Sequence, residues 1–573
     1  MRCRMSDVGC EGMAHRTWPH GTFGKGHGPR RTDRGPRASA LMCYVAMCNV
    51  LCAMWPTPPP NRHGARTGCP AKRRANRWHS HLHFRTRATR RRIMPPSPLP
   101  APRVFATIST HMPRQLLRTN SRLGKSLGTD GVRFLEHALG SIARLLPHVD
   151  VSNWTESVTT DKNGAVWGSN QRREIRVDVS FDLGNGKRRG LSAKVSRKAA
   201  PSGAGRVRRT LNDIEHGICN EVANRTARIL KAGDANASPE SLRALSPIFD
   251  EQIVAAFLES TQRYGVSVGD VLHSLRTLAE QTYENKALAF GCVLEPRRAR
   301  GPTVGSPAFP TEVLRKKKYR ALTDGFRSAY MVSSSGTVSR FVDLRNEEKD
   351  KSPSSNGYFP EWASDLARIS VDSRCGLCLT RAGDILVFQD GQLRFTYRFG
   401  RWHYWNHNHL ADLVSNLSRS QNVSKEIRGK VAKAVYRCAL DVSFRRSGGL
   451  LVILRSRSRA KKVLRDGDGL KHPNRDSLDC TFDSALPATT IQGMPRPLAA
   501  ELAGLDGAIV VDNTGVIVGY GAILQPKRHG RLGATEGSRT QAAKGASYFG
   551  VALKISSDGD IALYKIGDAV FTV

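Results

Sequence analysis

Acidic residues are scarce at the start of this 573-residue chain, where residues 1–120 hold 3 acids against 22 lysines and arginines. The same stretch contains 8 of the 10 methionines and 6 of the 12 cysteines, and it shows no sustained helical or strand periodicity. Without balancing acids or a periodic apolar pattern, a packed core is not expected. We therefore predict that residues 1–119 form a disordered basic segment.

Two other interpretations of this segment stay open. It could be a targeting leader, or it could be upstream sequence translated from a start codon placed too early. We favour the last, with Met112 or Met94 as the true start.

Long apolar runs are also missing, with one exception at residues 38–55, which read ASALMCYVAMCNVLCAMW. This run approaches membrane-spanning length, but its cysteines, methionines and internal Asn49 make it a poor span. It also lies too far into the chain for an ordinary signal peptide. A membrane location is therefore not favoured.

The charge of the whole chain is strongly basic, with 89 lysines and arginines against 49 acids and a net charge of +40. Such a balance suggests a nucleic-acid partner. The excess is concentrated in the first fifth, however, since the other 453 residues hold 67 basic and 46 acidic residues. Binding to nucleic acid is therefore the weakest of the functions that the sequence suggests.

A second Cys-x-x-Cys pair, which a zinc ribbon would need, is absent. Cys375 and Cys378 form the single pair, within an apolar run that predicts a strand. We expect buried free thiols and a reducing, cytoplasmic setting.

Several common catalytic signatures are missing as well: the P-loop, the kinase set, the Ser-His-Asp order and H-E-x-x-H. The segment RWHYWNHNHL offers His403, His407 and His409 but itself contains no carboxylate or thiol ligand, so an aromatic strand end is favoured over a metal site. The basic runs RKKKYR and RSRSRAKK lack a series of interleaved aromatics for base stacking, since Tyr319 alone does not make a stacking platform, and this favours solvated surfaces.

The rest of the chain predicts an α/β protein in three further regions. Residues 120–300 form a helix-rich α+β sensor or partner region, including a helix capped by Ser267. Residues 301–425 are rich in β-hairpins, and residues 426–573 form a mixed, largely antiparallel sheet flanked by helices.

Within this last region, residues 503–524 read AGLDGAIVVDNTGVIVGYGAIL, two apolar β-branched runs around a turn-like DNTG. Asp506 stands where the first strand begins, and could hold a divalent cation or accept a proton from a ribose hydroxyl. The small residues Gly507 and Ala508 after it would let a base or ribose approach the backbone.

A second motif, GSRTQAAKGAS, begins at Gly537 and leads into an alanine-rich helix. Free amides at the helix start, the hydroxyls of Ser538 and Thr540 and the guanidinium of Arg539 would suit a phosphate.

The order of these motifs, from FRRSGGLLVIL through LDGAIVV to EGSRTQAAKGAS, resembles the diadenylate cyclase (DAC) domain, the nucleotide-binding domain of the DNA-integrity scanning protein family. The resemblance covers roughly the last 150 residues. Asp506, Gly507 and Ala508 match the family's D-G-A. The residues that match its G-[TA]-R-H-R-A-A-x-G-x-S motif are Gly537, Arg539, Ala542, Ala543, Gly545 and Ser547.

The resemblance implies a catalytic, metal-binding Asp506, a Mg²⁺ or Mn²⁺ ion, and nucleotide contacts from Gly507, Ala508, Gly537, Ser538, Arg539, Thr540 and Ser547. It also implies a nucleotidyl transfer in which two facing domains join two ATP molecules into cyclic di-AMP. A homo-oligomer is therefore expected if the protein is catalytic.

The chain departs from the family at the R-H-R triplet, which is replaced by Arg539-Thr540-Gln541, and at an acidic S-E-E, which is replaced by SSDGD at residues 556–560. Two functions therefore stay open. One is an ATP-binding diadenylate cyclase. The other is a catalytically degenerate nucleotide sensor that relays occupancy to a partner.

Overall fold

The computed structural model describes residues 122–157, 174–182, 188–198, 210–231, 239–296, 306–347, 357–420, 422–470, 477–486, 488–525 and 536–573. The chain divides into two units, Met1–Ala106 and Thr107–Val573, and every described residue lies in the second. The predicted basic segment 1–119, its apolar run and both candidate starts lie outside the described residues. Among the described helices, none combines the length and the apolarity that crossing a bilayer needs.

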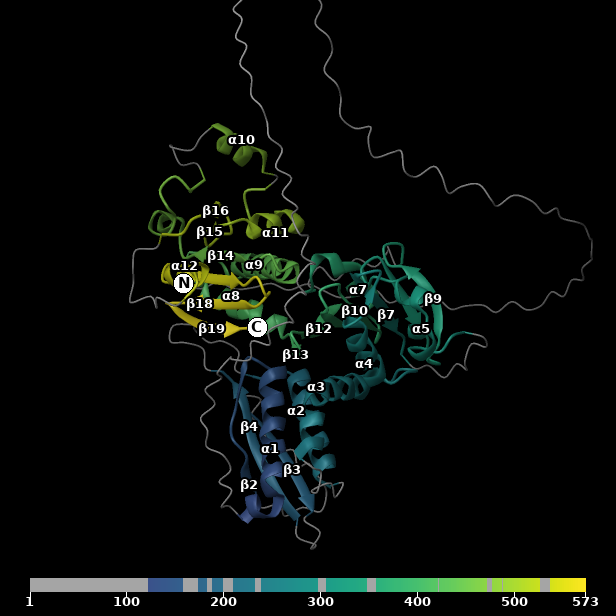
Figure 1. The fold of residues 1–573 in the computed structure, drawn as a ribbon. Coiled ribbons are helices and arrows are strands. Elements are labelled where there is room, and N and C mark those ends of the chain that lie inside the picture. The colour runs from purple at the N-terminus through teal and green to yellow at the C-terminus, as the bar shows by residue number, and fades with distance from the viewer. Residues whose placement is uncertain are drawn as a thin grey trace, which may run out of the picture. The chain divides into compact units, whose positions relative to one another are not determined.

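The first part of the described chain packs helices on a small antiparallel sheet, in which β4 pairs with β1, β2 and β3 (Figure 1). Ser267 caps its last helix by accepting a hydrogen bond from the Asp270 amide at 3.2 Å, as the sequence predicted. The helices are α1 (Arg122–Leu145), α2 (Asp213–Lys231), α3 (Pro239–Thr261) and α4 (Val268–Ala279), and the strands are β1 (Val149–Val151), β2 (Thr155–Ser157), β3 (Glu174–Asp182) and β4 (Arg188–Arg197).

The middle part is a seven-stranded sheet in the order β13-β12-β11-β10-β7-β8-β9, antiparallel except for the pair β7–β8. Its strands are β7 (Phe290–Leu294), β8 (Ser328–Val332), β9 (Val338–Asp343), β10 (Cys375–Leu379), β11 (Ile385–Gln389), β12 (Gln392–Arg398) and β13 (Arg401–Tyr404). The smaller elements are β5 (Thr282–Tyr283), β6 (Lys286–Ala287), α5 (Thr311–Arg315), α6 (Lys317–Arg320), the 3₁₀ turn η2 (Glu361–Ala363) and α7 (Ser364–Ile369). The sheet draws β7 from before residue 300, and the predicted domain boundaries stay predictions.

The C-terminal part is a six-stranded sheet in the order β16-β15-β14-β17-β18-β19, with only β14 and β15 parallel. Its strands are β14 (Gly449–Leu454), β15 (Ala508–Val511), β16 (Ile517–Ala522), β17 (Gly550–Ile555), β18 (Ile561–Lys565) and β19 (Asp568–Thr572). Its helices are α8 (His407–Leu417), α9 (Lys425–Arg445), the 3₁₀ helix η3 (Arg457–Lys462), α10 (Ser477–Ala485), α11 (Arg496–Gly504) and α12 (Ser538–Ser547). The predicted mixed α/β architecture is confirmed.

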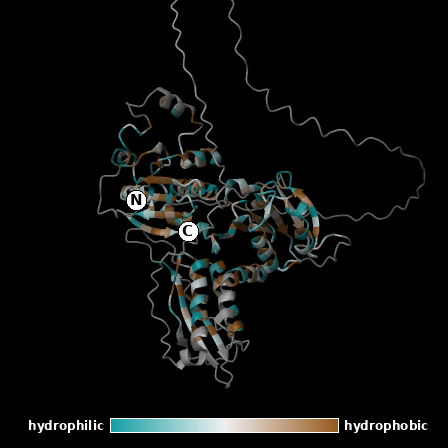
Figure 2. Ribbon diagram, in the orientation of Figure 1, coloured by the Kyte–Doolittle hydropathy of each residue, from teal (hydrophilic) through white to brown (hydrophobic). Residues whose placement is uncertain are grey.

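Helices cover both faces of this C-terminal sheet because its strands are apolar on both sides. Along β14, Leu450 and Val452 pack with α12, while Leu451 and Ile453 face α9 and α11. The strands are the browner elements of Figure 2, and the helices mix both colours. Each buried leucine or isoleucine side chain contributes about 1.5–3 kcal/mol to folding.

The DNTG turn between β15 and β16 is the predicted hairpin. Asp512, 5% exposed, accepts hydrogen bonds through Oδ1 from the amides of Thr514 at 2.9 Å and Val516 at 3.1 Å. Gly515 closes the turn at a φ of +89°. One buried carboxylate therefore fixes the register of the strand that begins after Asp506.

Candidate functional site

Most of the predicted nucleotide residues lie near the end of the sheet where strands β14 and β15 begin. These strands are parallel, with Leu451 opposite Ile509, so the register brings Gly448 beside Asp506. Strand β17 runs antiparallel to β14, with Gly449 opposite Ile555. The turn at residues 556–560 therefore follows at the same end of the sheet. We call this end, from Gly448 and Asp506 to that turn, the Asp506 edge.

Arg539 reaches the Asp506 edge from helix α12. A Cβ atom added to Gly448 would lie 2.5 Å from Arg539 Nη1, 3.4 Å from its Cζ and 3.5 Å from the Ser557 amide nitrogen. The guanidinium thus lies directly over Gly448, whose φ of +68° also favours glycine. Side chains in the first turn of a helix point back past its start, and this brings Arg539 over the strand.

The start of α12 is arranged for an anion. Gly537 is the N-cap and has no side chain to satisfy the first amides; its carbonyl accepts from the amides of Thr540 at 2.9 Å and Gln541 at 3.1 Å. Within the part of the chain that the structure describes, the Ser538 and Arg539 amides and the Arg539 guanidinium have no acceptor. Free amides, a helix dipole and a cation at one point favour negative charge.

Asp506 is exposed and, among the described residues, its carboxylate has no hydrogen-bond or ion-pair partner. Two large apolar side chains stand near it: Leu505 is 45% exposed and Ile523 is 48% exposed. These side chains offer apolar surface to a ligand at this edge. Asp468, which accepts from the Ile523 amide at 2.7 Å, is a carboxylate at this edge that was not predicted from the sequence.

Gly507 is small for a different reason from the predicted one. Its φ is +121°, and an added Cβ would lie 2.3 Å from the carbonyl carbon of Gly521 and 2.8 Å from the Ala522 nitrogen. The chain's own strand β16 therefore fills the space that the sequence assigns to a base or ribose. Ala508 is 2% exposed and packs in the core under α12.

Ser547 is not brought together with the other predicted residues. It lies in the last turn of α12, is fully buried, and donates to the Lys544 carbonyl at 2.6 Å while accepting from the Gly567 amide at 2.8 Å. The second bond holds the turn between β18 and β19. A serine at this place fixes the end of the helix rather than touching a ligand at its start.

Gln541, which replaces the second arginine of the family triplet, also has a structural contact. Its side-chain amide donates to the Glu536 carbonyl at 2.9 Å, and the Glu536 carboxylate pairs with Lys544 at 2.5 Å. Both bonds tether the segment that leads into Gly537. The third position of the triplet therefore shapes the helix start and adds no cation to it.

The turn at residues 556–560 is held from the middle part of the chain by Arg398, the last residue of β12. Arg398 is 5% exposed and donates to the carbonyls of Asp558 and Gly559, each at 3.5 Å, and to Ser443 Oγ at 3.0 Å. It also lies 3.3 Å from a carboxylate oxygen of Asp384. Nothing in the sequence pattern links β12 to this turn, so the role of Arg398 could not be predicted.

The histidines at residues 403–409 and the pair Cys375 and Cys378 were the other metal candidates. The described residues contain no group of three or more side chains that could hold a metal ion. His407 stacks between Trp405 and Tyr358, with Nδ1 3.0 Å from the Tyr436 hydroxyl. Cys375 and Cys378 are buried free thiols, as predicted, and point to opposite sides of β10 because they are three positions apart along the strand.

No family model and no curated protein matches the chain. Among solved structures, a hypothetical membrane spanning protein from Bacillus cereus is 19% identical, with 29% of this chain and 75% of that chain covered and a TM-score of 0.20. A double mutant of DacA from Staphylococcus aureus is 18% identical, with 26% of this chain and 87% of that chain covered and a TM-score of 0.17. Likenesses with TM-scores this low do not establish a shared fold.

Proposed function

We propose that the C-terminal part binds an adenine nucleotide at the Asp506 edge. The observation that carries the proposal is the Arg539 guanidinium, which lies over Gly448 beside the uncapped start of α12 and has no acceptor among the described residues. An arginine held at a helix start without a protein carboxylate is suited to a phosphate group. The choice of adenine rests on the resemblance to the DAC family.

Different residues of the Asp506 edge would contact different parts of the nucleotide. The amides of Ser538 and Arg539 and the Arg539 guanidinium hold phosphate oxygens. Leu505 and Ile523 provide apolar surface for the base. Gly507 and Ala508 act indirectly, because they set the strand start from which Asp506 projects.

Asp506 fits a Mg²⁺ or Mn²⁺ ion in the manner usual for nucleotide sites, where one or two carboxylates share the ion with phosphate oxygens and water. Its carboxylate is exposed and has no partner among the described residues. The bound ion would neutralise phosphate charge and polarise the α-phosphate. The alternative role of Asp506 is to accept a proton from a ribose hydroxyl.

The resemblance implies that two such edges face each other and that each 3′-hydroxyl attacks the partner nucleotide's α-phosphate. This chain carries Arg539 alone of the two family arginines. Loss of one charged phosphate contact weakens a complex by about 1.5–3 kcal/mol, and loss of a transition-state donor slows chemistry by about 10²–10³-fold. We therefore expect retained nucleotide binding and slow formation of cyclic di-AMP.

A nucleotide sensor is the second candidate, and Arg398 favours it. The turn that borders Arg539 is held by a side chain from the seven-stranded sheet, so an occupied edge and the middle part are mechanically linked. A ligand that shifts this turn alters the Arg398 contacts. That link gives a sensor a route from nucleotide to partner without any turnover.

Calorimetric titration of the full chain with ATP and Mg²⁺ tests the proposal. We expect Arg539→Met to weaken ATP binding by about tenfold or more, in line with a charged phosphate contact. Arg345→Met removes an equal charge from an exposed turn after β9 and should leave the affinity unchanged. Equal affinities for all three proteins, or no binding to the parent chain, would contradict the site.

The two candidate functions are separated by product analysis. Cyclic di-AMP that forms with the parent chain and disappears with Asp506→Asn supports the cyclase. ATP binding without product, with the affinity sensitive to Arg539→Met, supports the sensor.

A further inference from the structure

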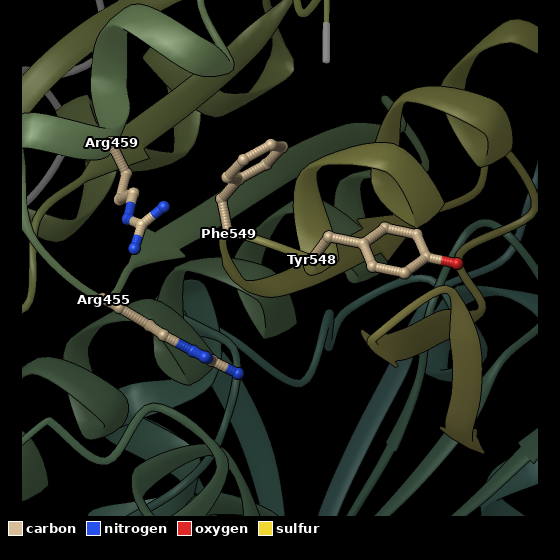
Figure 3. A pocket seen from close by; sticks show the side chains of 4 residues that line it. All are labelled: Arg455, Arg459, Tyr548 and Phe549. Atoms are coloured by element: carbon tan, nitrogen blue, oxygen red, sulfur yellow. The ribbon is translucent and has the colours of Figure 1, made fainter. Parts of the chain in front are cut away.

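A second site lies at the opposite end of the same sheet. A pocket of about 300 Å³ is lined by Arg455, Arg459, Tyr548 and Phe549 (Figure 3). Arg455 follows the last residue of β14 and Arg459 lies in η3, whereas the two aromatics follow the last residue of α12. The Asp506 edge is at the first residues of β14 and α12, so the two sites are separated by the length of these elements.

The pocket joins segments that are far apart in the sequence. The Arg455 amide donates to the Phe549 carbonyl at 3.1 Å, which ties the start of the RSRSRAKK run to the aromatic pair. In the sequence this basic run lacks aromatic neighbours, which favours a solvated surface. The fold supplies the missing aromatics from the end of α12.

The pocket and its rim are strongly positive. Arg455, Arg457, Arg459, Lys461 and Lys462 are all exposed or partly exposed, and none of them pairs with an acid among the described residues. Five unpaired cations in eight residues attract a ligand that carries phosphate groups.

A sixth cation lies buried behind the pocket. Lys565 is 4% exposed and its Nζ donates to the carbonyls of Leu417 at 2.7 Å and Gly550 at 3.0 Å. Burial, together with the charge of Arg455, lowers the pKa of Lys565 to about 8. Since Gly550 directly follows Phe549, this ammonium group adds to the positive field at the pocket wall.

Phe549, 8% exposed, forms the aromatic part of the pocket wall. Figure 3 shows Phe549 between Arg459 and Tyr548, with the tyrosine hydroxyl pointing away from both arginines. The hydroxyl approaches Gly567, where an added Cβ would be 2.6 Å from it, so the Tyr548 ring is fixed from behind. A pocket wall that carries both an aromatic ring and guanidinium groups offers a stacking surface to a base and a cation to its phosphate.

We propose that this pocket binds a nucleoside phosphate, either free or as one unit of a single-stranded nucleic acid. A volume of 300 Å³ is at the small end of ligand pockets and suits one such unit. The exposed cations of η3 continue beyond the pocket and would contact the phosphates of neighbouring units in a strand. This site is independent of the nucleotide proposed for the Asp506 edge.

The test measures binding of a fluorescein-labelled oligo-dT of about 12 nucleotides to the full chain by anisotropy. We expect the double variant Arg455→Ala/Arg459→Ala to weaken binding at least about tenfold, because two phosphate contacts are lost. The matched control, Lys317→Ala/Lys318→Ala, removes the same charge from the exposed basic helix α6 and should change the affinity less than about twofold.

Competition with AMP and with inorganic phosphate identifies the unit that is bound. Displacement of the oligonucleotide by AMP, but not by equal phosphate, shows that a single nucleoside phosphate fills the pocket. If AMP does not displace the labelled oligonucleotide but unlabelled oligo-dT does, the pocket binds one unit of a nucleic-acid strand. Phe549→Leu should weaken binding of either source by at least about threefold, since stacking is lost.

Equal weakening by the two double variants would overturn the proposal, because it would show charge attraction without a pocket. No binding at low salt would overturn it as well. Repeating the titration with Asp506→Asn and Arg539→Met distinguishes this site from the Asp506 edge, since those variants should leave oligonucleotide binding unchanged.

Discussion

At the scale of single residues, the Asp506 edge depends on glycines that leave room for other atoms of the protein. Gly448 leaves room for the Arg539 guanidinium, and Gly507 leaves room for the backbone of β16. The sequence marked Gly507 as a position that must be small, but it predicted that a ligand fills the space beside it. The sequence did not mark Gly448. The neighbours of these glycines come from segments that are distant in the sequence. The sequence therefore shows where a glycine is, but not which atoms occupy the space beside it.

Gly448→Ala should weaken ATP binding through the displacement of Arg539. The positive φ alone costs about 1 kcal/mol of unfolding free energy for an alanine. Gly383, with a φ of +82° and no atom within 4 Å of an added Cβ, is a matched control for that cost. We expect similar losses in urea unfolding for both alanine variants and a loss of ATP affinity for Gly448→Ala alone. Equal affinities would show that Arg539 can move away freely.

Buried neutral histidines should make the protein sensitive to mild acid. Burial lowers the pKa of His407 to about 3 and that of His403 to about 4, against an ordinary value of 6.5. As the pH falls below 6.5, these histidines become protonated in the unfolded chain but stay neutral in the folded chain. Each such histidine therefore removes about 1.4 kcal/mol of stability per pH unit until its folded pKa is reached.

His407→Phe tests this expectation, because it keeps the ring between Trp405 and Tyr358 but cannot titrate. The variant should be less stable at pH 7, since the Tyr436 hydroxyl and the Leu393 carbonyl lose a partner. Its unfolding free energy should then fall less steeply between about pH 6 and 4, by about 1.4 kcal/mol per unit. Parallel pH profiles for variant and parent would contradict the neutral state of His407.

At the scale of elements, the start of α12 and the 556–560 turn form one surface that the middle part of the chain supports through β12. The hairpin around Asp512 and the helix start at Gly537 could be predicted, because their signals lie within a few neighbouring residues. The contact of Arg398 with the turn could not, since 160 residues separate Arg398 from Asp558. The same holds for the pocket formed by Arg455 and Phe549.

Arg398→Lys should loosen the 556–560 turn and weaken ATP binding by about fivefold. A lysine keeps the charge beside Asp384 but cannot reach the carbonyls of Asp558 and Gly559 and the Ser443 hydroxyl together. The readout is ATP affinity together with amide hydrogen exchange of the turn. Arg401→Lys, in the exposed start of β13, is the control. Faster exchange with unchanged affinity would show that the turn is not part of the site.

At the scale of the whole molecule, buried polar contacts join the described parts of Thr107–Val573. Glu215 in α2 is fully buried; its carboxylate accepts from Arg197 at 2.6 Å and from Asn406, the N-cap of α8, at 2.8 Å, and lies 2.5 Å from His148 Nε2. Burial alone would raise the pKa of Glu215, but His148 and Arg197 outweigh it and hold that pKa at about 2. The overall α/β class could be predicted from periodicity, whereas this junction could not, because no local pattern marks it.

Glu215→Gln should lower the unfolding free energy by about 3 kcal/mol or more, because Arg197 is left buried without a carboxylate. The double variant Glu215→Gln/Arg197→Met removes that stranded charge and should recover part of the loss. Urea unfolding of the single and double variants measures both effects. Additive losses would show that the two side chains are not coupled.

Binding of a nucleotide where α12 and β15 begin can be followed by amide hydrogen exchange of the full chain, with and without ATP and Mg²⁺. With ATP at a concentration near the Kd of the parent chain, we expect slower exchange at residues 536–541 and 505–508 and in the 556–560 turn, and much weaker protection in Arg539→Met at the same concentration. Protection confined to other segments, or equal protection in Arg539→Met, would contradict a nucleotide site at the Asp506 edge.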